Sequence, residues 1–209
     1  MRFWVAFSLA VMVFFSALSG PAPVYGAEEP VLRGMVTDEG QKMPGVSVNV
    51  WDGKVTRRAV SNSEGQFIVR GLVPGRPFAV RWTPRGPGMK FSVRVGDFTF
   101  PENGDLYMSM DYGSVGRGNI YTVRLPSNPS TGYGWRALNK GTAVVKLQEN
   151  VFEQDGGTAE QAATGRPGTD LWKYRGTAQG KTIIIFGYNR PWEKFETSAR
   201  YHVLSMTVR

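Results

Sequence analysis

From residue 31 to residue 100 the chain alternates short apolar runs with turn-forming residues. Within the runs, apolar and polar side chains alternate, as in strands that bury one face. The runs lie at residues 31–37, 45–51, 66–70, 78–82, 91–95 and 97–100. Groups of Asp, Ser, Pro and Gly separate them, and these residue types favour turns. Strands at this spacing predict an antiparallel β-sandwich.

The second half of the chain has a similar pattern, and no stretch of it has a sustained helical period. Strand-like runs lie at residues 105–112, 119–125, 143–149, 169–174, 181–188 and 200–208. Glycines at residues 113–118 predict a hairpin loop, and the small, polar residues 150–168 predict a long flexible loop. The fold class expected is therefore all-β, with two consecutive β-sandwich domains at residues 27–100 and 105–209 and a short polar linker at residues 101–104.

The first 26 residues have the form of a secretory signal peptide. Arg2 precedes an apolar run that ends near Leu18, and Gly20 and Pro21 follow that run. The run is about 16 residues long, shorter than the roughly 20 that a membrane span needs. We therefore expect cleavage, export to the periplasm or the medium, and no stable membrane span. A retained membrane anchor is the alternative.

The composition offers little for catalysis. The chain has no cysteine and one histidine, His202, and its formal net charge is +8. An exported protein without cysteine has no disulfides, no zinc-thiolate site and no thiol nucleophile. A lone histidine in a strand supports neither a catalytic triad nor a metal site. We expect no enzyme, no cofactor, no metal and, without a basic stripe rich in aromatics, no nucleic-acid partner.

Three loop signatures between the runs of the second half are the most specific features of the sequence. The first comprises Asn128, Pro129, Ser130, Thr131, Gly132 and Tyr133. The second comprises Gly165, Arg166, Pro167 and Gly168, and the third Arg190, Pro191 and Trp192. Proline fixes its own φ and glycine permits tight turns, so the first loop is expected to be stiff, with Ser130 and Thr131 at its tip. The third loop combines a cation and a large aromatic, the residue types enriched at binding hot spots.

The order of these loops, together with the Gly-Trp pair that follows the first, resembles the chagasin-type inhibitors of cysteine peptidases. The resemblance covers nearly all of residues 105–209. It implies an immunoglobulin-like sandwich that acts as a monomer and inserts the three loops into the cleft of a papain-like cysteine peptidase. Residues 128–133 would lie nearest the catalytic cysteine, and the other two loops would grip either side. Inhibition of this kind is reversible and non-covalent.

The second loop departs from that family at one position. The family has two adjacent glycines there, whereas this chain has Pro167 before Gly168. Proline removes a backbone N–H and biases Arg166 towards an extended conformation. We expect this loop to differ most from the family.

The first half resembles the carboxypeptidase regulatory-like, transthyretin-like sandwich, on residues 36–38, 43–48, 63–67 and 71–75. Such modules are adhesive or spacing elements, and the resemblance implies no binding residues. The alternative function for the whole chain is therefore an adhesion or ligand-binding module. It would use tryptophans and arginines expected on the surface of the first half, where they could contact glycans or anionic polymers. These are Trp51, Trp82, Arg57, Arg58, Arg81 and Arg85.

Overall fold

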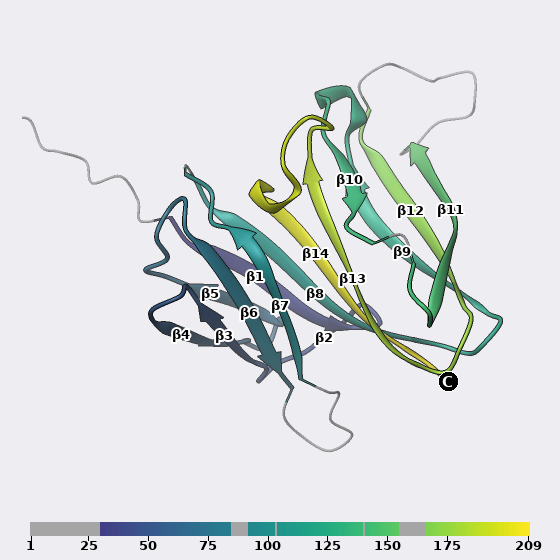
Figure 1. Ribbon diagram of the computed structural model, residues 1–209, viewed down its shortest axis with the longest axis horizontal. Coiled ribbons are helices and arrows are strands. Elements are labelled where there is room, and N and C mark those ends of the chain that lie inside the picture. The colour runs from purple at the N-terminus through teal and green to yellow at the C-terminus, as the bar shows by residue number, and fades with distance from the viewer. Residues whose placement is uncertain (1–29, 85–91, 103, 140, 155–165) are drawn as a thin grey trace, which may run out of the picture.

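The computed structural model describes residues 30–84, 92–102, 104–139, 141–154 and 166–209. In this part of the chain every regular element is a β-strand or a single 3₁₀ turn. The strands form three sheets that lie in layers, with the largest sheet in the middle (Figure 1). The all-β fold class is thus confirmed.

The strands have the following bounds. In the first half they are β1 (Leu32–Asp38), β2 (Gln41–Lys42), β3 (Ser47–Trp51), β4 (Thr56–Val60), β5 (Gln66–Val69), β6 (Pro77–Thr83) and β7 (Val93–Thr99). In the second half they are β8 (Leu106–Val115), β9 (Ile120–Ser127), β10 (Gly134–Ala137), β11 (Val145–Gln154), β12 (Gly168–Gly176), β13 (Gly180–Asn189) and β14 (Arg200–Val208). The 3₁₀ turns η1 and η3 span Pro129–Thr131 and Phe195–Thr197.

The middle sheet joins the two halves of the chain. Its order is β10-β13-β14-β8-β1-β2, with β5 also paired to β1. Strand β8 runs parallel to β1 on one side and parallel to β14 on the other. Parallel strands are typically buried on both faces, and sheets of four and three strands cover the two faces of this sheet. The outer sheets have the orders β4-β3-β6-β7 and β11-β12-β9.

Each face of the middle sheet packs on its own hydrophobic core. Alternation along β14 divides its side chains between the two: Tyr201 and Val203 belong to the core beneath β4-β3-β6-β7, and Leu204 and Met206 to the core beneath β11-β12-β9. All four side chains are fully buried. A nearly continuous apolar run therefore marks a strand that is buried on both faces, as β14 is.

Sequence reasoning missed β4 and β10, because Thr56–Val60 carries two arginines and Gly134–Ala137 is only four residues long. The expectation of a loop from residue 150 onwards is wrong at its start, since β11 continues to Gln154. Its side chains from residue 148 are exposed, so it lacks the burial pattern by which strands are recognised. The hairpin expected at residues 113–118 is also wrong, because β8 and β9 belong to different sheets.

The domain boundaries at residues 27–100 and 105–209 remain a prediction. In the structure, β8 of the second half pairs with β1 of the first half as well as with β14. The signal peptide at residues 1–26 lies outside the described residues. Among the residues that are described, no helix is long and apolar enough to cross a bilayer.

Candidate functional site

The first loop, residues 128–133, is held by its own hydrogen bonds. The Thr131 hydroxyl donates to the Asn128 carbonyl at 2.7 Å, and the Ser130 hydroxyl donates to Asn128 Oδ1 at 2.6 Å. Gly132 closes the turn with φ of 77°, in the left-handed region that favours glycine. Ser130 and Thr131 are exposed. The loop crosses from β9 in one sheet to β10 in another, so it is not a hairpin.

The third loop lies at the start of residues 190–199, the connection between β13 and β14, and this connection begins with a closed turn. The Arg190 N–H donates to Glu193 Oε2 at 3.0 Å, and the Glu193 N–H donates to the Arg190 carbonyl at 3.0 Å. Pro191 and Trp192 lie at the tip between them. The Trp192 side chain is 75% exposed. A large aromatic at this exposure contributes little to the core, so it is available for contact with a partner.

Arg136, on β10, fastens the third loop to the sheet. Its guanidinium donates to the carbonyls of Pro191 and Glu193, at 3.2 and 2.8 Å, and to Asn189 Oδ1 at 2.8 Å. Asn189 is 2% exposed, and its amide donates to the Lys194 carbonyl at 2.9 Å. A single cation therefore satisfies several oxygens of the loop, and hydrogen bonds to a charged group are stronger than neutral ones.

Aromatic contacts tie the first loop to the third. The Tyr133 and Tyr188 rings stack with centroids 5.8 Å apart, and the Arg190 guanidinium lies 4.7 Å from the Tyr133 ring centroid. The Tyr188 hydroxyl accepts the Asn128 N–H at 3.1 Å. Each cation–π contact at such a surface stabilises by about 0.5–1 kcal/mol. The two loops therefore behave as one unit.

The second loop is described only at Arg166, Pro167 and Gly168, and Gly165 lies outside the described residues. Pro167 is exposed just before the start of β12. Gly168 has no room for a side chain, because a Cβ would lie 2.3 Å from the Glu153 carbonyl oxygen. The glycine is therefore required by the close approach of β11, and not by an unusual φ.

Strand pairing brings the three loops to one end of the C-terminal half. Gly168 pairs with Ser127, the last residue before the first loop, and Gly134 pairs with Asn189, the last before the third. The first loop therefore lies between the other two, as the ends of β9, β10, β12 and β13 show (Figure 1).

Asp170 is a carboxylate near the same end of β12. Burial raises the pKa of its carboxyl group above the usual value.

Sequence reasoning named the tips of these loops and missed their supports. The expected site residues did not include Arg136, Tyr188, Glu193 or Arg200. The Arg200 guanidinium lies 5.8 Å from the ring centroid of Trp135 and 5.3 Å from that of Tyr188. A signal was present in the Asn-Arg-Pro-Trp-Glu order, in which Glu193 can accept the Arg190 N–H. Arg136 gave no signal, because its contacts are more than 50 residues away.

Comparison with known proteins places this end of the molecule in a family. The model of the chagasin family peptidase inhibitor I42 matches residues 114–204. Amoebiasin-2 of Entamoeba histolytica is 28% identical over 91 residues, which are 44% of this chain and 72% of that protein.

Two solved structures are also similar. The cysteine protease inhibitor EhICP2 of Entamoeba histolytica is 23% identical with a TM-score of 0.39, over 49% of this chain and 97% of that one. PbICP-C, solved in complex with falcipain-2, is 18% identical with a TM-score of 0.39, over 50% of this chain and 91% of that one. The family model and the loop motifs together show that residues 114–204 form a domain of the chagasin family of peptidase inhibitors.

Proposed function

We propose that this chain is an exported, reversible and non-covalent inhibitor of papain-like cysteine peptidases. In this proposal the three loops block the active-site cleft, with Thr131 at the tip of the central loop. The observation that carries it is the joining of the first and third loops by Arg190 and Tyr133, in a domain whose family consists of inhibitors and not enzymes.

The order within the loops supports tight binding. Association costs free energy for each side chain and loop that must be fixed, at about 0.5–1.5 kcal/mol per flexible side chain. The hydrogen bonds of Thr131, Arg136 and Glu193 fix the first and third loops before any partner arrives. More of the contact energy is then left as affinity.

Trp192 is the residue from which we expect the largest single contribution. Tryptophan and arginine dominate binding hot spots, where truncation costs about 2 kcal/mol or more. Trp192 projects with Arg190 beside it, 5.8 Å from its ring centroid. The peptidase interface would bury about 1,600 Å² in total, which is the standard size for such complexes.

Export is part of the proposal and rests on residues 1–26. Whether these residues are removed is tested by mass spectrometry of the protein recovered from the periplasm or the medium. An intact N-terminus on protein recovered from the membrane fraction would show a retained anchor instead.

The inhibition test titrates papain with the purified chain lacking residues 1–26, and uses trypsin as the serine-peptidase control. We expect loss of papain activity and none of trypsin activity. Trp192→Ala is expected to weaken inhibition about 30-fold or more, in line with a hot spot of 2 kcal/mol. Thr131→Arg is expected to abolish inhibition, because a long cation at the central tip cannot enter the cleft.

Two variants serve as matched controls for these substitutions. Trp51→Ala removes another exposed tryptophan, and Ser63→Arg places the same cation in an exposed turn of the first half. Both should inhibit like the unaltered protein. The proposal fails if the folded chain leaves papain and related cysteine peptidases active at micromolar concentration.

A further inference from the structure

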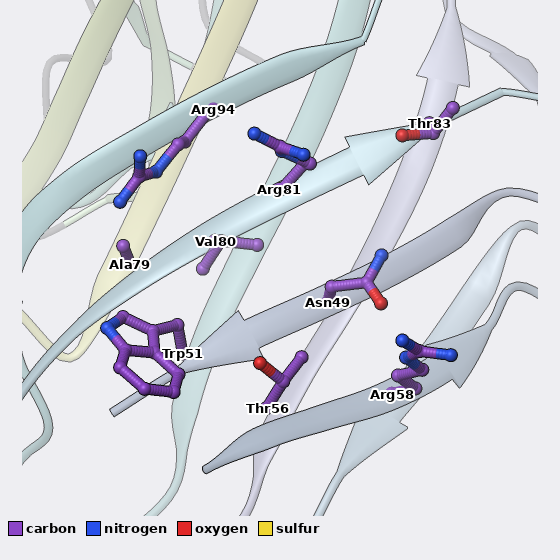
Figure 2. Close-up of a pocket in the computed structure, with 9 residues that line it drawn as sticks. All are labelled: Asn49, Trp51, Thr56, Arg58, Ala79, Val80, Arg81, Thr83 and Arg94. Carbon is purple, nitrogen blue, oxygen red and sulfur yellow. The ribbon is translucent and has the colours of Figure 1, made fainter. Parts of the chain in front are cut away.

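The outer face of the β4-β3-β6-β7 sheet carries an unusual row of charges. Strand pairing places Asn49 between Arg58 and Arg81, and places Arg94 directly opposite Arg81. The row thus crosses all four strands, from Arg58 through Asn49 and Arg81 to Arg94. Figure 2 shows these side chains on the same sheet, with Trp51 beside them.

The arginines of this row have no acidic partner among the residues that the structure describes. None of the acidic side chains that the structure describes forms an ion pair with Arg58, Arg81 or Arg94, and all three are exposed. Arg57, the neighbour of Arg58, differs because its guanidinium is bonded to Asp52. Like charges directly opposite each other on a sheet are destabilising. The Arg81–Arg94 pair therefore costs stability, and an anion bound between the two would relieve the repulsion.

The surroundings of the row are polar and hollowed. A depression of about 390 Å³ is lined by the three arginines, Trp51, Asn49, Thr56 and Thr83. Trp51 is 42% exposed, whereas Trp82, which the sequence suggested as a surface residue, is fully buried. Arg85 lies outside the described residues. The face thus offers guanidinium forks for anionic groups, hydroxyl and amide groups for hydrogen bonds, and one indole ring for stacking.

We propose that this face binds an anionic polysaccharide, whose acidic groups pair with Arg58, Arg81 and Arg94 while a sugar ring lies against Trp51. The row spans three strand spacings, about 14 Å at roughly 4.8 Å each. That length fits a polymer with several acidic groups in line better than a single small anion. Single-stranded nucleic acid is a poorer match, because its binding uses successive aromatic platforms and this face has one. A membrane surface is also poorer, because such binding relies on apolar side chains that insert.

The test measures binding of the chain lacking residues 1–26 to polygalacturonate, with its methyl ester as the uncharged control polymer. We expect binding to the acid form and not to the ester. Arg81→Gln and Arg94→Gln are each expected to weaken binding about tenfold, the effect of losing one charge-assisted hydrogen bond. Trp51→Ala should weaken it about fivefold or more, which corresponds to about 1 kcal/mol for the loss of one stacked ring.

The control for net charge is Arg117→Gln, which removes an exposed cation from the β8–β9 loop. It should change binding less than twofold. Inhibition of papain should be unchanged in every variant, and Arg81→Gln should melt at the same or a higher temperature, because it removes the like-charge repulsion. A loss with Arg117→Gln equal to that with Arg81→Gln would show diffuse attraction and overturn the proposal. The proposal is also overturned if the chain does not bind polygalacturonate. The same holds if it binds an oligo-dT strand or phosphatidylserine vesicles more tightly than polygalacturonate and that binding depends on Arg81.

Discussion

At the scale of single residues, the protonation of His202 is set by its place in the sheet. Its Nδ1 lies 2.8 Å from the Ser109 hydroxyl, its ring packs against Phe186, and desolvation lowers its pKa to about 4. The unfolded chain has the usual value of 6.5. Between these two pH values the unfolded state binds a proton that the folded state does not. The contribution of His202 to stability is therefore complete above pH 6.5 and is lost as the pH falls towards 4.

We expect His202→Gln to remove this dependence, because glutamine keeps a hydrogen-bonding group and does not titrate. The unaltered protein should lose more stability than the variant when the pH falls from 7 to 4. The difference between their losses in free energy of unfolding should be on the order of 2 kcal/mol. Urea denaturation at several pH values measures the difference.

Asp111→Asn provides a control of opposite sign. Burial raises the pKa of the Asp111 carboxyl, so the folded state holds its proton more tightly than the unfolded state. Asp111→Asn should therefore increase the free energy of unfolding, relative to the unaltered protein, more at high pH than at low pH. Parallel curves for His202→Gln and the unaltered protein across the pH range would show that His202 is not desolvated as the structure indicates.

At the scale of elements, the third loop depends on β10 for its shape. Replacing Arg136 with alanine leaves the carbonyls of Pro191 and Glu193 without this donor, and the loop must then be ordered at the cost of binding energy. We expect Arg136→Ala to weaken papain inhibition about tenfold or more, although Arg136 is not at the loop tip. The inhibition constant measures this effect directly.

Two further variants separate positioning from general loss of charge. Arg136→Lys should restore part of the affinity, because one ammonium replaces a guanidinium that bonds to three residues. Arg124→Ala, at an exposed arginine on β9, should inhibit normally. If Arg136→Ala inhibits as well as the unaltered protein, the third loop is ordered without it and its assigned role is wrong.

At the scale of the whole molecule, the shared middle sheet makes the two halves interdependent. Leu106, Met108, Met110, Tyr201 and Val203 come from the C-terminal half, and they are fully buried in the core that the first half completes. Exposing such a set costs on the order of 10 kcal/mol, comparable to the whole stability of a typical domain. We expect the full chain to unfold in a single calorimetric transition, and the fragment of residues 105–209 to be much less stable and prone to aggregate.

The two faces of β8 provide the control for that expectation. Within the fragment, Met108→Lys should reduce aggregation because it places a charge on the newly exposed face. Tyr107→Lys, at the neighbouring residue, whose side chain is already exposed in the full chain, should not. A fragment that melts at the temperature of the full chain would show two independent domains, as the sequence pattern alone suggests.

The sequence by itself determined most of the strands and the positions of the candidate loops. Alternation at residues 45–51 and 78–82 identified strands because burial of one face fixes the period of the pattern, and proline and glycine in residues 128–133 marked a turn through their own backbone limits. These are local constraints, and they can be read locally. Strands β10 and β4 were missed because β10 is only four residues long and β4 carries two arginines, so neither has a clear alternating pattern.

Only the tertiary structure decided what lies beside what. The insertion of β8 between β1 and β14, the contact of Arg136 with Pro191, and the opposition of Arg81 and Arg94 all join residues distant along the chain or on separate strands. A hydrophobic pattern specifies that a strand is buried but not against which neighbour, because the packing free energy depends on area and shape and not on sequence order. The chain therefore encodes its loops locally, whereas the unit that the loops form depends on pairing across the sheets.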